Sequence, residues 1–174
     1  MCNYQSAKVQ KIKGIAKRNG LFVTFLVILH ANSKGIITEK MDLKEFFKGD
    51  KFAALAGIEL MEIGDGYGKA RMLITPDHLN GGGFCQGGAL FTLADLAFAA
   101  AVNSHNVLTV STSSNITYVR SVKEGYVYAE AHELVNHHRM PYAEVVITDE
   151  DGDTIAIFTS SGYRKGQPNI AMPK

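Results

Sequence analysis

The sequence of 174 residues has little cysteine, almost no net charge and no apolar run long enough to cross a bilayer. Its two cysteines, Cys2 and Cys85, exclude a disulfide framework and form neither a CxxC pair nor a metal-like spacing. The formal net charge of +1 provides no overall field for nucleic acid or an anionic membrane. The apolar run LFVTFLVIL has nine residues, whereas a membrane-spanning helix needs about 20. We therefore expect no nucleic-acid partner and no stable membrane insertion.

A hydrophobic content of 46% and a charged content of 20% are typical of a soluble globular protein, and 174 residues fit one domain. Residues 1–31 combine a basic stretch, a short apolar run and a small residue, which resembles a secretory signal. An Asp-x-x-Glu capping box at 42–45 then indicates the start of a helix. We predict a leader or N-terminal extension at 1–40, a single domain at 41–166 and a C-terminal tail at 167–174. We expect a cytoplasmic protein, with a secreted or periplasmic one as the alternative that the signal-like stretch suggests.

The middle of the chain predicts one long helix. From Ala89 to Val102 the sequence is apolar at nearly every position, which is typical of a helix buried on almost all sides, and the whole helix is predicted at 87–103. Alternating apolar residues and turn residues predict strands at about 58–63, 67–75, 107–121, 125–136, 140–149 and 153–164. The pattern favours an α+β domain in which a curved antiparallel sheet of five to six strands wraps around the helix.

Gly87 and Gly88 open the predicted helix. Their backbone N–H groups belong to the unpaired donors of a helix start, and the missing side chains let a ligand approach closely. The helix dipole adds positive potential there, so a carbonyl oxygen that gains negative charge would be stabilised, as in an oxyanion hole. The same two glycines also fit a simple tight turn into the helix.

Asp95 is the single carboxylate in the apolar helix. An ionised carboxylate among apolar neighbours costs several kcal/mol unless it is paired, which indicates either a functional group or a structural carboxylate that caps a neighbouring loop. Asp95 lies eight residues after Gly87, about 12 Å along one helix. No single thioester carbonyl can touch both groups at that distance. Either the two are unrelated, or the site is assembled from two chains, with Asp95 of one chain facing the Gly87 amide of the other.

The segment N-x5-QGG-x6-LAD, with Asn80, Gln86, Gly87, Gly88 and Asp95, resembles the motif of the hotdog-fold acyl-CoA thioesterases, in particular the phenylacetate-pathway and THEM-like group. The stretch VSTSSNITYVRSVKEG also resembles that family's third strand and following turn. The resemblance covers about residues 55–164. It implies a hotdog fold and a homodimer with active sites between protomers, with a dimer of dimers as a further possibility. It also implies an acyl-CoA substrate whose coenzyme A is part of the substrate, so that no separate cofactor is expected.

Carried over position by position, the resemblance implies a role for each motif residue. Asp95 would activate water as a general base or attack the thioester carbonyl itself. The Gly87 N–H would hold the carbonyl oxygen across the interface, Asn80 would orient the water or the substrate, and Ser111 would hydrogen-bond near Asp95 from its own strand. Gln86 departs from the family, which has histidine there, and glutamine can hydrogen-bond but cannot change its protonation state near neutral pH.

Further residues are candidates for binding the substrate. Arg120 and Lys123 stand at the end of the Ser111 strand, where this family often meets the nucleotide end of coenzyme A, although a solvated strand end is an equal alternative. His138 and Arg139 fall in a turn that could contact a coenzyme A phosphate or simply be solvated. The predicted substrate-binding set is Gly88, Arg120, Lys123, His138 and Arg139. The histidines and carboxylates show no ligand spacing, so we predict no metal site.

Thioester hydrolysis has two competing hypotheses. The same fold supports hydration or dehydration of acyl thioesters, but that chemistry normally uses a histidine with an acidic partner, and Gln86 counts against it. The chain could also bind acyl-CoA without turnover. Asp95 favours catalysis, because an alanine would pack better at that position. A thioester also suits a lone carboxylate, since the thiolate departs without a strong general acid.

Overall fold

The computed structural model describes residues 42–167 of the chain. The predicted leader at 1–40 lies outside this range, and so does the predicted tail apart from its first residue. The elements are α3 (Leu43–Phe47), α4 (Lys51–Leu55), β1 (Ile58–Gly64), β2 (Tyr67–Leu73), the 3-10 turn η1 (Pro76–His78), α5 (Gly87–Asn103), β3 (Thr109–Tyr118), β4 (Tyr126–Val135), β5 (Tyr142–Thr148) and β6 (Thr154–Arg164). The predicted long helix has the observed bounds. Each predicted strand begins and ends within three residues of the corresponding observed strand.

The two short helices each begin at an aspartate. Asp42 Oδ1 accepts a hydrogen bond from the Lys44 N–H at 3.0 Å, and Asp50 Oδ1 accepts one from the Ala53 N–H at 3.0 Å. The predicted helix start at Asp42 is therefore confirmed. Glu45, however, forms an ion pair with Lys48 at 2.6 Å instead of completing the predicted capping box.

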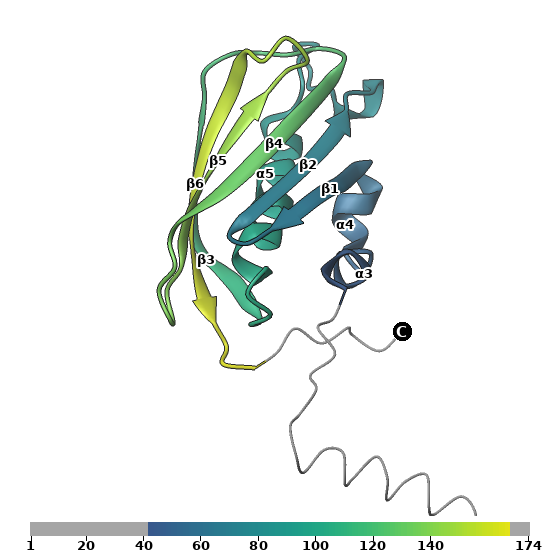
Figure 1. Ribbon diagram of the computed structural model, residues 1–174. Coiled ribbons are helices and arrows are strands. Elements are labelled where there is room, and N and C mark those ends of the chain that lie inside the picture. Colours follow the sequence, from purple (N-terminus) through teal and green to yellow (C-terminus); the bar gives the residue numbers. More distant parts are fainter. Residues whose placement is uncertain (1–41, 168–174) are drawn as a thin grey trace, which may run out of the picture. The chain divides into compact units, whose positions relative to one another are not determined.

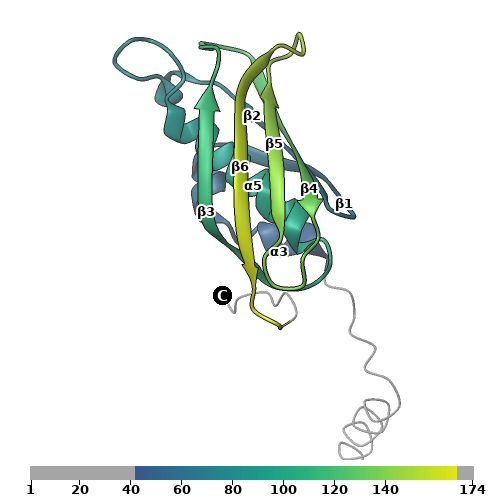
Figure 2. The same ribbon diagram turned by 90° about the vertical axis from the view of Figure 1, so that its left-hand side faces the viewer.

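The six strands form one antiparallel sheet in the order β1-β2-β4-β5-β6-β3. Figure 1 shows the sheet curving around α5, and Figure 2 shows β3, β6 and β5 side by side in front of that helix. Within residues 42–167, β3 pairs with β6 alone, so the sheet is open and β3 forms one of its edges. The core lies between α5 and the concave face of the sheet, and its largest enclosed apolar side chains are Phe98, Phe158, Met72 and Leu93. The predicted α+β architecture is confirmed.

Helix α5 approaches strand β2 so closely that no side chain fits between the two backbones. A Cβ atom at Gly68 would collide with the Ala97 carbonyl oxygen and would lie 2.9 Å from both the Ala100 Cβ and the Ala101 nitrogen. Glycine in a strand commonly marks such a close approach. The contact continues through fully buried alanines on both layers, namely Ala70, Ala129, Ala131, Ala143 and Ala156 on the strands and Ala94, Ala97, Ala100 and Ala101 on the helix.

One face of α5 remains partly open. Gly88 is exposed, and Thr92, Asp95 and Ala99 are half-buried, with spacings of four, three and four residues that place them along one side of the helix. The prediction of a helix enclosed on nearly every side is therefore wrong for this face. The physical reason is that β3 is an edge strand, so the sheet does not continue over the side of α5 that carries Asp95.

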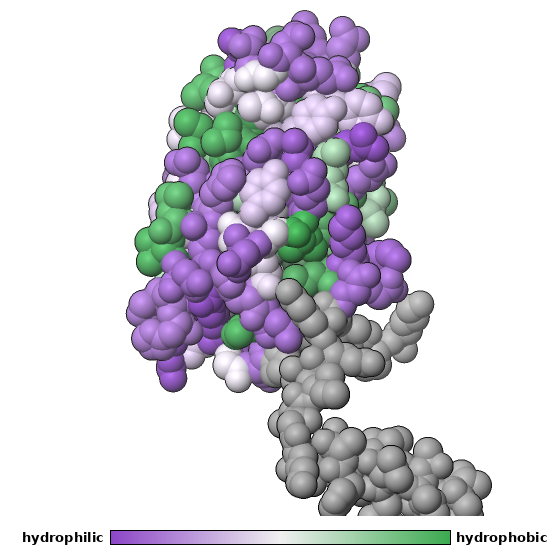
Figure 3. All heavy atoms as spheres, in the orientation of Figure 1, coloured by the Kyte–Doolittle hydropathy of each residue, from purple (hydrophilic) through white to green (hydrophobic). Residues whose placement is uncertain are grey.

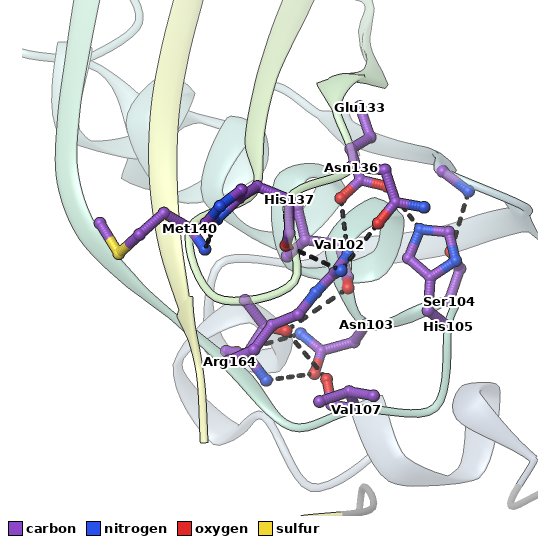
Figure 4. A network of polar contacts seen from close by, with 12 residues as sticks. Val102, Asn103, Ser104, His105, Val107, Glu133, Asn136, His137, Met140 and Arg164 are labelled. Atoms are coloured by element: carbon purple, nitrogen blue, oxygen red, sulfur yellow. Dashed lines mark hydrogen bonds and ion pairs between the residues drawn. The ribbon is translucent and has the colours of Figure 1, made fainter. Parts of the chain in front are cut away.

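The C-terminal end of α5 is held by a polar network, shown in Figure 4. The Asn103 side chain accepts from the Thr109 N–H at 2.9 Å and donates to the Thr109 carbonyl at 3.1 Å, which ties the helix end to the start of β3. Beside it, Arg164 donates to Glu133 at 2.8 Å, and Glu133 also contacts His105. The Glu133 side chain is only 2% exposed, so its charge requires these partners.

The exposed hydrophobic residues of the described domain are scattered. On the face drawn in Figure 3, hydrophobic residues form separate patches among hydrophilic ones. Among the helices of residues 42–167, none has both the length and the hydropathy of a membrane span.

We expect Gly68→Ala to destabilise the domain by about 1–3 kcal/mol, the usual cost of overpacking a core. The added methyl group would meet the α5 backbone, which can give way only if the whole helix shifts. Urea unfolding monitored by circular dichroism measures the change. Gly81→Ala serves as a control, because nothing lies within 4 Å of a Cβ at that position. Equal midpoints for the two variants would contradict the proposed backbone contact.

Candidate active site

Asp95 and Ser111 form a hydrogen-bonded pair between α5 and β3. The Ser111 hydroxyl donates to Asp95 Oδ1 at 3.0 Å, the contact that the resemblance to the hotdog thioesterases implies. Asp95 is half-buried and Ser111 is exposed, so the pair lies at the open face of α5 rather than in the core. A carboxylate in this place is accessible to water or to a substrate.

The surroundings of Asp95 favour its protonated form. Burial raises the pKa of the Asp95 carboxyl above its ordinary value, the hydrogen bond from Ser111 lowers it in part, and the negative charge of Asp50 adds a smaller increase. A carboxylate with a raised pKa is a stronger base once it is ionised.

The start of α5 presents one unpaired backbone donor. Gln86 is the N-cap, and its side-chain oxygen accepts a hydrogen bond from the Gly88 N–H. The Gly87 N–H, in contrast, has no acceptor among residues 42–167. Of the two amides that the sequence singles out, the Gly87 amide is therefore the one available to a ligand, and the helix dipole adds to its positive potential.

The loop before α5 holds Asn80 beside this donor. The Asn80 N–H donates to the Phe84 carbonyl at 2.8 Å, and Asn80 Oδ1 accepts from the Gly82 N–H at 2.8 Å. His78 fixes the start of the loop, because its Nδ1 accepts from the Thr75 N–H at 3.0 Å and its Nε2 then donates to the Ala56 carbonyl at 3.0 Å. The Asn80 side-chain oxygen is thus used within the loop, and its NH₂ group is the part that can face a ligand.

Asn80 and Gly87 line a common pocket with a volume of about 480 Å³ at the start of α5, called here the helix-start pocket. Its wall is mostly apolar, with Tyr118 and Arg120 as its largest polar members. Cys85 also lies in this wall, and burial raises the pKa of its thiol, which disfavours the nucleophilic thiolate. The complete lining is Asn80, Phe84, Cys85, Gly87, Leu90, Tyr118, Val119, Arg120, Ser121 and Val122.

Two basic residues of the predicted substrate-binding set, Arg120 and Lys123, lie at the helix-start pocket. Arg120 lines the helix-start pocket and forms an ion pair with Asp153. The Lys123 ammonium lies 4.6 Å from the centre of the Phe84 ring, and that ring also belongs to the pocket wall. Both side chains are exposed and so remain accessible to an anionic group of a ligand.

The structure does not bring His138 and Arg139 to the same place within one chain. They occupy the exposed loop between β4 and β5, which Arg164 holds near the far end of α5 through its contact with the His137 carbonyl at 3.0 Å. That end is separated from Gly87 by sixteen residues of helix, about 24 Å. Their role in binding substrate remains a prediction.

Tyr118 belongs to the pocket but was not among the predicted residues. Strict alternation along a strand would place it on the opposite face from Ser111, seven residues earlier. A β-bulge between Ser111 and Ser113 inserts an extra residue, so Ser111 and Tyr118 both face α5. The bulge has no clear signal in the run of serines and threonines that forms it.

A profile of the thioesterase superfamily matches residues 82–156, which contain the helix start, Asp95 and Ser111. A putative esterase of Archaeoglobus fulgidus is 34% identical over 119 residues, which cover 68% of this chain and 77% of that protein. The acyl-coenzyme A thioesterase PaaI of Escherichia coli is 28% identical over 121 residues, which cover 69% and 86%. The chain belongs to the thioesterase superfamily. It is a thioesterase of the PaaI-like group, as the sequence motif predicts.

The solved structures agree with this assignment. The Escherichia coli PaaI protein superimposes with a TM-score of 0.70 at 27% identity, over 73% of this chain and 93% of that one. The hotdog fold predicted for this thioesterase is therefore confirmed, in the form of an open sheet around one central helix.

We expect Asp95→Asn to raise the thermal unfolding midpoint at neutral pH. Because burial raises the pKa of Asp95 in the folded chain, folding disfavours the ionised form, and stability falls as the pH rises from the ordinary value of 3.8 through the raised pKa. Asparagine removes this cost, and each kcal/mol gained should add about 2–4 °C. The gain should disappear near about pH 3, where the carboxyl is protonated in both states.

Asp151→Asn is the matched control for this measurement, because Asp151 is exposed in the turn between β5 and β6. Its midpoint should equal that of the wild type at both pH values. A lower midpoint for Asp95→Asn at neutral pH would instead identify Asp95 as a structural carboxylate.

Proposed function

We propose that this thioesterase hydrolyses acyl-CoA thioesters at a site shared by two chains, with Asp95 from one chain and the Gly87 N–H from the other. The observation that carries the proposal is the half-buried Asp95 carboxylate, held by Ser111 at the open face of the same helix whose start presents the unpaired Gly87 donor. A carboxylate that raises the cost of folding and faces an accessible surface fits a catalytic role better than a structural one.

The two-chain arrangement follows from the length of the helix. Gly87 and Asp95 are separated by eight residues of continuous helix, about 12 Å, so one carbonyl group cannot contact both in the same chain. β3 has an unpaired edge within residues 42–167 and borders the open face that carries Asp95. A second copy on this side, related by a twofold axis, would place each Asp95 opposite the helix start of the other chain.

The chemistry needs only the groups that the site contains. Ionised Asp95 accepts a proton from water while the water oxygen bonds to the thioester carbonyl carbon. The carbonyl oxygen gains negative charge and accepts a hydrogen bond from the Gly87 N–H. The C–S bond then breaks, the thiolate leaves, and the proton passes from Asp95 to the products. In the alternative path Asp95 attacks the carbon directly and water hydrolyses the resulting acyl-aspartate.

The acyl-CoA assignment rests on the binding groups near the helix-start pocket. The mostly apolar pocket wall suits an acyl or pantetheine chain, and Arg120 and Lys123 suit the phosphates of coenzyme A. The relative from Escherichia coli is named as an acyl-coenzyme A thioesterase, which supports the same substrate class. Asn80 would position the water or the thioester through its free NH₂ group.

The first experiment is thiol release from a panel of aliphatic and aromatic acyl-CoAs. The wild type should turn over at least one of them, and Asp95→Asn should lose at least about a hundredfold in kcat, the usual contribution of a general base. Asp151→Asn should retain wild-type activity, because that carboxylate lies in an exposed turn. Tight binding of acyl-CoA without turnover by the wild type would instead make the chain a binding protein.

Mixing two inactive variants tests whether the site is shared. Asp95→Asn removes the base. Gly87→Pro removes the donor at the first helical position, where the helix itself does not use the N–H, and its ring also displaces Tyr118 from the same helix start. A mixed dimer has one site with both defects and one intact site, so random pairing of equal amounts should restore about a quarter of the wild-type rate. Mixtures that stay inactive, although mass spectrometry shows mixed dimers, would mean that each site belongs to one chain.

A further inference from the structure

Tyr118 makes two contacts with Gly87 at the start of α5. Its hydroxyl donates a hydrogen bond to the Gly87 carbonyl at 2.7 Å. Its ring occupies the space where a Gly87 side chain would lie, because a Cβ there would be 2.8 Å from both the Tyr118 Cζ and its hydroxyl oxygen. The side chain is nevertheless 48% exposed and forms part of the helix-start pocket wall.

These contacts hold one peptide group at both of its ends. The Gly87 carbonyl and the Gly88 N–H belong to the same peptide unit. Tyr118 donates to the carbonyl, and Gln86 accepts from the N–H. Hydrogen bonds in such a chain polarise and strengthen one another. The peptide cannot rotate without breaking both bonds. The Gly87 N–H belongs to the preceding peptide, whose carbonyl, that of Gln86, accepts from the Ala89 N–H at 3.0 Å. The Gly87 N–H therefore lies between two peptide groups that are each held by hydrogen bonds, and its direction is fixed.

Helix geometry gives no structural reason for the Tyr118 hydroxyl. The start of a helix lacks acceptors for its N–H groups, whereas its first carbonyls already accept bonds from amides four residues later. The hydrogen bond from Tyr118 to the Gly87 carbonyl therefore does not satisfy a backbone group that the fold would otherwise leave unpaired. Burial also raises the pKa of the Tyr118 hydroxyl, with a smaller contribution from Cys85, so the group keeps the proton that it donates.

We propose that Tyr118 is a positioning residue, which fixes the first peptide of α5 so that the Gly87 N–H is presented to the thioester oxygen. This inference rests on the function proposed above. A donor that is already in place stabilises the oxyanion without reorganisation during the reaction, which is the main source of an oxyanion hole's effect. The same contact explains why residue 87 is glycine, because any side chain would displace the Tyr118 ring.

The test is Tyr118→Phe, which removes the hydroxyl and keeps the ring. With the best acyl-CoA of the panel, kcat should fall about three- to tenfold, the effect of one lost hydrogen bond, while KM stays within about twofold. The control is Tyr142→Phe, because the Tyr142 hydroxyl forms no hydrogen bond within residues 42–167. An unchanged kcat for Tyr118→Phe, measured beside an active wild type, would overturn the inference and leave the proposed function standing.

A double-mutant cycle adds a readout that simple destabilisation does not reproduce. Gly87→Ala keeps the N–H but should lower kcat, because its methyl group pushes against Tyr118. Tyr118→Leu removes the obstacle, so adding Gly87→Ala to Tyr118→Leu should cost little further activity. Independent, additive losses in the double variant would show that the two residues do not act as a unit, and would also overturn the inference.

Discussion

The contact between the α5 backbone and the β2 backbone fixes the geometry of the whole domain. At Gly68 the Ala97 carbonyl and the Ala101 nitrogen lie where a side chain would otherwise be, and buried alanines extend the contact across the sheet. Such a contact leaves no room for the helix to slide or rotate. The start and the middle of α5 are therefore held against β3, with Gly87 in contact with Tyr118 and Asp95 hydrogen-bonded to Ser111.

A helix held this rigidly also separates its functional groups. The unpaired Gly87 donor and the Asp95 carboxylate cannot approach each other within a chain, and the sheet ends at β3 before it covers Asp95. An apolar helix with a half-buried carboxylate on its open side is a costly arrangement for a monomer. The proposed second chain would resolve it, because that chain would cover this face and would complete the proposed shared site.

The sequence was sufficient for the helices and strands and for the placement of most residues of the candidate site, and the reasons are local. Apolar runs of different period separated α5 from the strands, and the spacing of Asn80, Gly87 and Asp95 identified the motif. The β-bulge beside Ser111 was not predictable, because it depends on how β3 pairs with β6. The place of Tyr118 depends on that bulge, and the open face of α5 depends on which strand forms the edge. The place of Tyr118 and the open face of α5 are both set by the pairing of strands in the sheet, which no short segment of the sequence reveals.

Gln86 is suited to capping the helix rather than to transferring a proton. The family commonly has histidine at this position, a residue that can move protons, whereas Gln86 caps the helix and occupies the Gly88 N–H. The helix start then contributes only fixed dipoles, namely the Gly87 N–H and the peptide clamped by Tyr118. A thiolate leaves without needing an acid, so hydrolysis can proceed without a proton donor there. In the proposed mechanism proton transfer falls to Asp95, and the raised pKa of its carboxyl and its contact with Ser111 suit it to that task.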